Sequence, residues 1–105
     1  MDISRLKYFM AVTKTLNFTK AAEELYISHS TVSRAISELE TEFGVSLFER
    51  SNRSVKLTSA GEYLAEQAQD LIRRADVLES EMKRFGREQT PSFRIAFLSC
   101  QARKY

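Results

Sequence analysis

The sequence predicts a mainly α-helical fold, in which three short helices and a β-hairpin precede one long helix. Glycine and proline, which most often interrupt helices, number only three and one in 105 residues. Two short alternating apolar runs interrupt the helical pattern once, within residues 45–58. Apolar residues at regular helical spacing then continue from residue 64 to residue 85, which indicates an extended final helix.

The first two helices are predicted from their caps and apolar spacing. Asp2 is a good N-cap for a helix over residues 3–14, whose apolar positions are Ile3, Leu6, Phe9, Met10 and Val12. Asn17 lies in a break and can cap a second helix over residues 18–25. The apolar face of that helix consists of Phe18, Ala21, Ala22 and Leu25. Its two adjacent alanines would let another helix approach closely.

A third helix follows a short turn over residues 26–28, from which Ile27 is expected to plug the core. Ser28 is a strong N-cap, and Gly44 is expected to end the helix in a left-handed conformation. The side expected to face inward carries Val32, Ala35, Ile36, Leu39 and Phe43. The opposite side carries a polar stripe of Ser30, Ser33, Arg34 and Ser37.

Residues 45–50 and 55–58 flank a polar turn and predict a hairpin, with Asn52 suited to a left-handed turn position. The long helix starts either with Ser59 in a capping box with Glu62 or with Thr58 as its cap, and it extends to about Phe85. Its apolar steps alternate between four and three, which is typical of a dimerising seam: Leu64, Ala68, Leu71, Ala75, Leu78, Met82 and Phe85. The seam either packs on its own domain or meets a second chain, and its regularity favours the second chain.

Three regions are therefore expected: residues 1–58 as a winged helix-turn-helix, residues 59–87 as a linker and dimerisation helix, and residues 88–105 as a hinge and the start of a truncated further domain. Residues 86–91 are interpreted as a linker, and residues 93–98 as a strand. In a winged helix-turn-helix, the short turn sets the third helix across the second and turns its N-terminal half outward.

The composition excludes several classes of function. The net charge of +2 is too small to indicate a polyanion partner by itself, so the placement of the charges must carry that argument. One cysteine, Cys100, and one histidine, His29, build neither an internal disulfide nor a zinc site. Without a glycine-rich phosphate loop either, we expect no enzyme and no cofactor. We see no signal peptide and no run of ~20 apolar residues, so a soluble, cytoplasmic protein without membrane association is expected.

The chain resembles the N-terminal part of the LysR-type transcriptional regulators over about residues 1–90. The matching residues lie in segments 6–9, 17–25, 32–34, 43–45, 47–50 and 57–61, with Ser28, Ile36, Leu39 and Glu40. The resemblance implies that the third helix reads the major groove and that His29, Ser30, Ser33 and Arg34 face DNA. His29, Ser30 and Thr31 depart from the family's usual residues at the helix start, which bears on which bases are read.

The residues expected to contact DNA are polar, are expected to be exposed, and lie on the second helix, the third helix and the hairpin. Arg34 can donate two hydrogen bonds to a guanine edge, or it can pair with Glu38 one turn later. Arg53 at the hairpin tip is suited to a minor groove or a phosphate, and Arg50 and Lys56 can flank it as backbone contacts. The full set is Thr19, Lys20, His29, Ser30, Thr31, Ser33, Arg34, Ser37, Arg50, Arg53 and Lys56.

The resemblance further implies a bacterial, sequence-specific regulator that binds double-stranded DNA as a homodimer at an interrupted inverted repeat. Regulators of this family carry an effector-binding domain after the linker, and residues 93–98 resemble its opening strand. The chain ends before such a domain forms, so we expect it to bind DNA but to sense no small molecule; an effector would act only on a full-length form. The alternative is a winged-helix module used for protein contacts, but such modules usually lose the exposed basic residues that this chain keeps.

Overall fold

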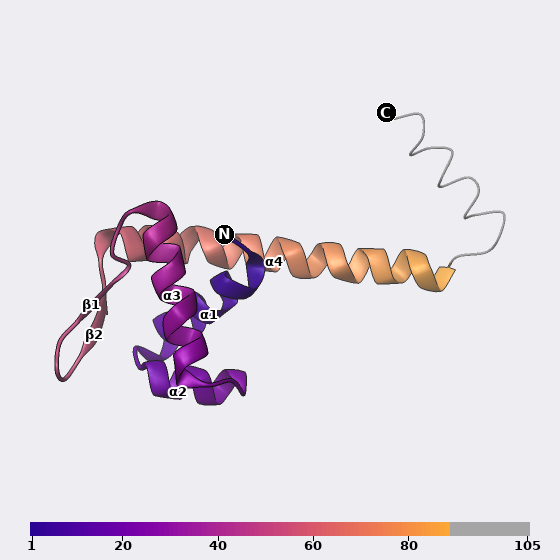
Figure 1. Ribbon diagram of the computed structural model, residues 1–105. Helices are drawn as coiled ribbons and strands as arrows, with labels where there is room; N and C mark the ends of the chain where they lie inside the picture. Colours follow the sequence, from indigo (N-terminus) through magenta and orange to yellow (C-terminus); the bar gives the residue numbers. More distant parts are fainter. Residues whose placement is uncertain (89–105) are drawn as a thin grey trace. The chain divides into compact units, whose positions relative to one another are not determined.

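The computed structural model describes residues 1–88 of the 105-residue chain. Its elements are α1 (Ile3–Thr15), α2 (Phe18–Leu25), α3 (His29–Phe43), β1 (Phe48–Arg50), β2 (Val55–Leu57) and α4 (Ser59–Glu88) (Figure 1). The predicted fold class is confirmed. The chain forms two compact units, Met1–Arg74 and a second that begins at Ala75, so the first half of α4 belongs to the same unit as the hairpin. The strand expected over residues 93–98 lies outside the described residues, as does Cys100.

Each short helix begins directly after the residue predicted to cap it. Asp2 accepts a hydrogen bond from the Arg5 backbone N–H, and Asn17 accepts one from Lys20. Ser28 accepts one from the Thr31 backbone N–H. These side-chain oxygens satisfy N–H groups that the first turn of a helix leaves without a backbone partner.

The ends of α1 and α2 show a feature that the sequence did not indicate. Both helices end in the left-handed conformation on residues other than glycine, at Leu16 with φ 51° and Tyr26 with φ 59°. The Leu16 N–H donates a hydrogen bond to the Val12 carbonyl, and the Tyr26 N–H donates to the carbonyls of Ala22 and Glu23. Gly44 ends α3 at φ 67°, as predicted.

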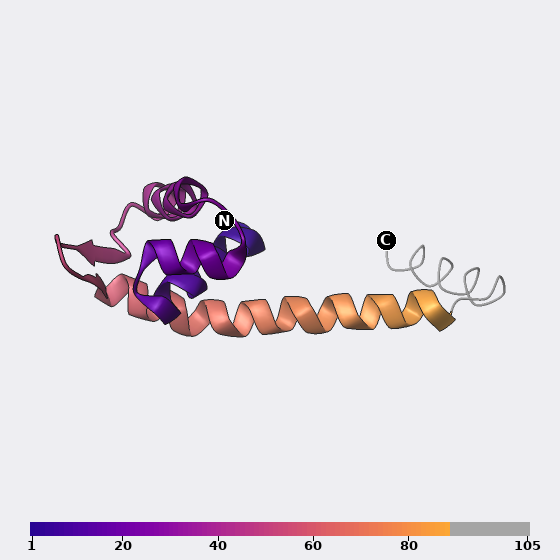
Figure 2. The same cartoon turned by 90° about the horizontal axis from the view of Figure 1, so that it is seen from below.

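The core lies where α1, α2 and α3 meet the start of the hairpin. Figure 2 views these helices from below and shows α3 nearly along its axis. The core side chains are Phe9, Val12, Phe18, Ala21, Ala22, Val32, Ile36, Leu39, Leu47 and Phe48, with Ile27 packed against them from the turn. Because α2 presents two buried alanines to this cluster, the neighbouring helices can lie close to it.

Phe43 does not face inward as expected, because 42% of its surface is exposed. It lies in the last turn of α3, on one wall of an open apolar hollow of about 240 Å³. The other walls are formed by Val45, Leu47, Ala60, Tyr63 and Leu64. No side chain of this unit fills the hollow, so the ring stays half in solvent.

The hairpin is antiparallel, with Phe48 opposite Leu57 and Arg50 opposite Val55. Its four-residue loop is closed by a hydrogen bond of 2.9 Å from the Ser51 N–H to the Ser54 carbonyl. Asn52 does not take the predicted left-handed conformation, since Leu16 and Tyr26 are the residues other than glycine with positive φ among residues 1–88. A four-residue loop can be built around a turn that needs no positive φ.

The start of α4 is fixed to the segment before β1. Thr58, and not Ser59, caps the helix: its Oγ1 accepts from the Gly61 N–H at 3.0 Å and donates to the Ser46 carbonyl at 2.6 Å. Gly61 is buried, and a Cβ atom built there would lie 2.2 Å from the carbonyl oxygen of Leu47. Only glycine permits this approach of helix to backbone.

The apolar seam of α4 divides in two. Ala68 is fully buried within its own unit, and Leu64 is partly buried against the core. Dimerisation through the seam therefore stays a prediction that rests mainly on its later positions. Farther along, Leu71, Leu78, Met82 and Phe85 are exposed.

The helix α4 also continues through Gly86 to Glu88, where a linker was predicted. A glycine lowers helix stability by about 1 kcal/mol without having to end the helix. No helix within residues 1–88 combines the length and apolarity that crossing a bilayer requires.

Candidate nucleic-acid interface

The polar stripe of α3 lies on the outside of the domain. Ser30, Arg34 and Ser37 are exposed and Ser33 is partly exposed, while Val32 and Ile36 on the other side are fully buried. The N-terminal end of α3 and the hairpin extend to the same side of the domain (Figure 1). The helix is therefore held by its apolar side and presents its polar side next to the hairpin.

The first turn of α3 carries a small network of hydroxyl groups. The Ser28 Oγ lies 2.7 Å from the Thr31 Oγ1 and 3.2 Å from the Ser30 Oγ. Both neighbours are exposed. The cap therefore orients two of the hydroxyls predicted to contact DNA, and each retains lone pairs for a further partner.

Phe18 joins three of the predicted contact regions through its ring. The Arg50 guanidinium lies over this ring, 4.5 Å from its centroid, in a cation–π contact. The His29 ring centroid lies 6.1 Å away and the Phe48 ring centroid 5.8 Å away. Phe18 is the first residue of α2, so the starts of α2 and α3 and the end of β1 meet at one aromatic side chain.

Glu40 attaches the hairpin to α3, a role that the sequence analysis missed. Its Oε2 accepts from the backbone N–H of Leu47 at 2.8 Å and of Phe48 at 3.4 Å. Its Oε1 lies 3.9 Å from the Arg50 guanidinium, and only 22% of the side chain is exposed. The available signal was a charged residue beside Leu39, at the edge of the inward face of the helix.

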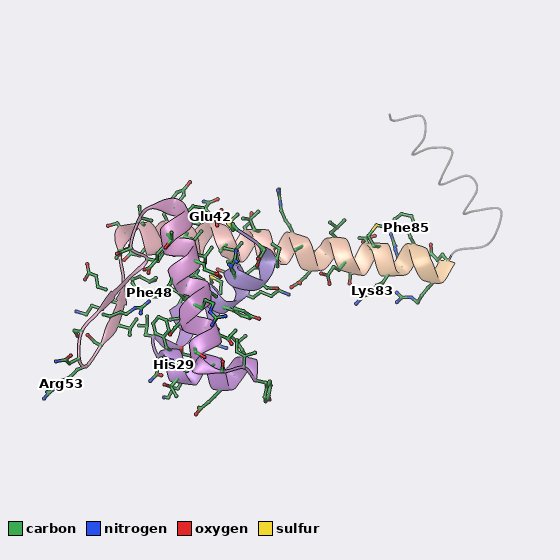
Figure 3. All side chains as sticks on the ribbon, viewed as in Figure 1. His29, Glu42, Phe48, Arg53, Lys83 and Phe85 are labelled. Carbon is green, nitrogen blue, oxygen red and sulfur yellow. The ribbon has the colours of Figure 1, made fainter. Side chains whose placement is uncertain are left out.

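Arg53 lies at the hairpin tip and His29 at the start of α3, as Figure 3 shows. Arg53 is exposed, and within residues 1–88 it forms no ion pair. Lys56 and Arg50 both border an open hollow of about 260 Å³ at the hairpin. Thr19 and Lys20 are exposed at the start of α2. The structure thus exposes ten of the predicted contact residues and leaves Ser33 partly exposed.

The alternative role considered for Arg34, an ion pair with Glu38, is not formed. Glu38 instead binds Arg5 of α1, whose Nε donates to Oε1 at 3.1 Å. The Arg34 guanidinium has no hydrogen bond or ion pair to any of residues 1–88. In the same part of the chain, no three His, Cys, Asp or Glu side chains are grouped closely enough to hold a metal ion.

Comparison with known sequences identifies relatives over nearly the whole chain. A probable cat1 operon transcriptional activator of Acinetobacter lwoffii is 38% identical over 99 residues, covering 94% of this chain and 33% of the relative. The regulator BenM of Acinetobacter baylyi is 38% identical over 98 residues, covering 93% of this chain and 32% of BenM. The chain thus spans about a third of the length of these curated relatives, which are named as regulators of transcription and not as enzymes.

Solved structures with the same fold include DNA complexes. The BenM DBD in complex with catB site 1 DNA superposes with a TM-score of 0.78 at 40% identity, over 82% of this chain and 97% of that chain. The CbnR DBD in complex with DNA gives a TM-score of 0.77 at 34% identity, over 82% of this chain and 99% of that chain. The fold is therefore the winged-helix domain of these regulators.

A match between this chain and a family sequence profile identifies the family. The profile described as bacterial regulatory helix-turn-helix protein, lysR family, matches residues 3–62, which is more than half of the chain. The match includes α1, α2, α3, the hairpin and the first turn of α4. The chain belongs to the lysR family of bacterial regulatory helix-turn-helix proteins.

Proposed function

We propose that this chain binds double-stranded DNA in a sequence-specific manner and thereby regulates transcription. The observation that carries the proposal is the two-sided environment of α3. Its apolar residues are fixed in the core, while Ser30, Arg34 and Ser37 are exposed beside a hairpin with Arg53 at its tip. A helix held in this way can enter a major groove without losing its packing.

Each part of the surface has a distinct task in this proposal. Arg34 donates two hydrogen bonds to a guanine edge, and the serines are short enough to let the helix lie deep in the groove. Arg53 enters the neighbouring minor groove or binds a phosphate. Lys20, Arg50 and Lys56 bind the DNA backbone and set the register of the helix without reading sequence. His29, Thr19, Thr31 and Ser33 complete the contact surface.

We further propose that the chain acts as a homodimer on an interrupted inverted repeat. Leu78, Met82 and Phe85 are exposed along the part of α4 after Arg74, and exposed apolar residues repeating by four and three favour pairing of helices. A two-fold dimer presents two reading helices and requires two half-sites related in the same way. Because the relatives are about three times longer, a small-molecule effector would act through a further domain in a full-length form.

The decisive test of DNA reading is selection of bound duplexes from a random pool, followed by titration of the selected duplex. We expect an inverted repeat to be enriched and its affinity to fall steeply with salt. Arg34→Ala should lose at least ~1 kcal/mol of discrimination between the selected duplex and a scrambled one. Equal affinity of the unaltered chain for both duplexes would contradict the proposal.

Dimerisation has its own test, sedimentation of the chain without DNA. Leu78→Glu places a charge in the seam and should raise the dimer dissociation constant at least about tenfold, since a buried unpaired charge is costly. Val77→Glu is the matched control, because the neighbouring Val77 is exposed to a similar extent but lies outside the seam. Equal effects of the two substitutions, or none from Leu78→Glu, would refute pairing through this seam.

A further inference from the structure

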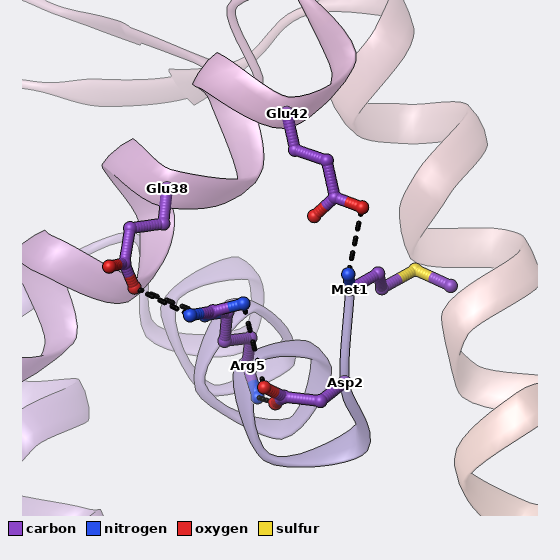
Figure 4. Close-up of polar contacts among 5 residues, drawn as sticks. All are labelled: Met1, Asp2, Arg5, Glu38 and Glu42. Atoms are coloured by element: carbon purple, nitrogen blue, oxygen red, sulfur yellow. Dashed lines mark hydrogen bonds and ion pairs between the residues drawn. The ribbon is translucent and has the colours of Figure 1, made fainter.

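Two ion pairs join the start of α1 to the outer side of α3. In Figure 4, the Arg5 guanidinium reaches Glu38, and the Met1 ammonium lies 2.8 Å from Glu42. The Arg5 Nη2 lies 3.0 Å from the Glu38 Oε1, and its Nε donates to the same oxygen at 3.1 Å. Arg5 therefore binds Glu38 through two of its nitrogens.

Glu38 has a second arginine within one helical turn. Arg34 precedes it by four residues on α3, the spacing at which side chains of opposite charge meet on a helix surface. Arg5, Arg34 and Glu38 line the same open hollow of about 410 Å³, together with Ser37 and Thr41. Both arginines thus lie near the Glu38 carboxylate, and in the structure this carboxylate pairs with Arg5.

The geometry explains why Arg5 prevails over Arg34. Asp2 holds Arg5 in place, since one carboxylate oxygen accepts the Arg5 backbone N–H at 2.8 Å and the other lies 3.5 Å from its Nη1. The Arg5 side chain is only 33% exposed, so solvent screens its charge less than that of a fully exposed residue. The order of Arg34 before Glu38 along the helix is also the less favourable orientation for a pair at this spacing.

We propose that Arg5 is a positioning residue for DNA reading: by holding Glu38, it keeps the guanidinium of Arg34 available for a base edge. Glu38 is a negative charge next to the reading stripe, and without Arg5 it would attract Arg34 and repel the DNA phosphates. The proposal rests on the proposed function of α3. It assigns to α1, which carries none of the predicted DNA contacts, a role in setting the affinity of the reading helix.

The test is a double-mutant cycle between Arg5 and Glu38, measured by fluorescence anisotropy on the duplex selected by the unaltered chain and on its scrambled form. Arg5→Gln should weaken binding to the selected duplex up to about fivefold, the upper end expected for one solvent-exposed ion pair. Glu38→Gln in the same chain should restore the affinity, because no carboxylate then remains to occupy Arg34. Arg5→Lys keeps a cation beside Glu38 and should retain most of the affinity.

Lys14→Gln is the matched control, because it removes one exposed positive charge from the same helix, at its far end. It should weaken binding to both duplexes alike, and its effect should simply add to that of Glu38→Gln. A specific coupling of Arg5 with Glu38, and none of Lys14 with Glu38, would support the proposal. Equal behaviour of the two cycles would overturn it, since net charge alone would then explain the loss. A double variant as weak as Arg5→Gln would also overturn it.

A measurement without DNA separates this inference from the proposed function. In NMR spectra of the arginine side chains, the Arg34 guanidinium should rotate freely in the unaltered chain and be hindered in Arg5→Gln, where it pairs with Glu38. An unchanged Arg34 signal in a folded Arg5→Gln variant would refute the inference even if DNA is read as proposed. If the unaltered chain shows no preference for the selected duplex, the proposed function fails, whatever the NMR signal shows.

Discussion

Replacing Gly61 by alanine tests how closely α4 is attached to the hairpin domain. The new Cβ would lie 2.2 Å from the Leu47 carbonyl oxygen and 2.8 Å from the Leu57 side chain. That oxygen cannot simply move, because it accepts a hydrogen bond of 3.0 Å from the Thr58 N–H and Leu47 is buried. Forcing an extra atom into a packed site costs about 1–3 kcal/mol.

Two smaller contributions also enter the change in the free energy of unfolding caused by Gly61→Ala. Displacing the Leu47 carbonyl weakens its hydrogen bond, which contributes about 1 kcal/mol, while alanine gains roughly as much in helix propensity over glycine. The free energy of unfolding should therefore fall by about 2 kcal/mol, and the melting temperature by about 8–16 °C for a domain of this size.

The assay is urea and thermal unfolding followed by circular dichroism. Gly86→Ala is the matched control, because the same substitution in the same helix meets no atom within 4 Å. It should leave the melting temperature unchanged or raise it slightly, by helix propensity alone. If Gly61→Ala were as stable as the unaltered chain, the close approach of α4 to the Leu47 backbone would not be a constraint on the fold.

Three further predictions concern single side chains. Tyr26→Asn should raise the free energy of unfolding by about 0.5–1 kcal/mol in urea titrations, because Tyr26 is 94% exposed and asparagine tolerates its φ of 59° better. Glu40→Ala should lower it by about 1–3 kcal/mol, since the Leu47 N–H loses its acceptor, and Glu40→Gln should lower it less. Arg53→Ala should reduce the salt dependence of DNA binding by about one unit of slope if Arg53 binds a phosphate; an unchanged slope in anisotropy titrations would contradict that contact.

Local signals predicted most of the fold. The caps at Asp2, Asn17 and Ser28 each depend on a side chain and a backbone N–H three residues later, so the sequence carries the whole interaction. The alternation of apolar and polar residues on α3 likewise predicted its buried side up to Leu39. The prediction failed at Phe43 because the pattern states only that a residue is apolar, not whether another element covers it, and in the structure Phe43 borders an open hollow.

The candidate site was predicted as a set of residues but not as an arrangement. Spacing alone suggested an ion pair between Glu38 and Arg34. In the structure Glu38 instead pairs with Arg5, which lies 33 positions away in the sequence. The cation–π contact of Arg50 on Phe18 and the anchoring by Glu40 are also tertiary contacts without a local signature. The left-handed end of α2 at Tyr26 was missed because such ends are usually occupied by glycine or asparagine.

Because Glu40 binds the start of β1, the direction and the length of the hairpin depend on different residues, and a designer could vary them independently. The direction of the hairpin is set at its base, where a carboxylate on α3 holds two consecutive backbone N–H groups. The length of the hairpin is set at Ser51–Ser54, where serine contacts close the loop. Insertions in the loop should therefore extend the arm along its existing line, while its angle to the reading helix stays the same.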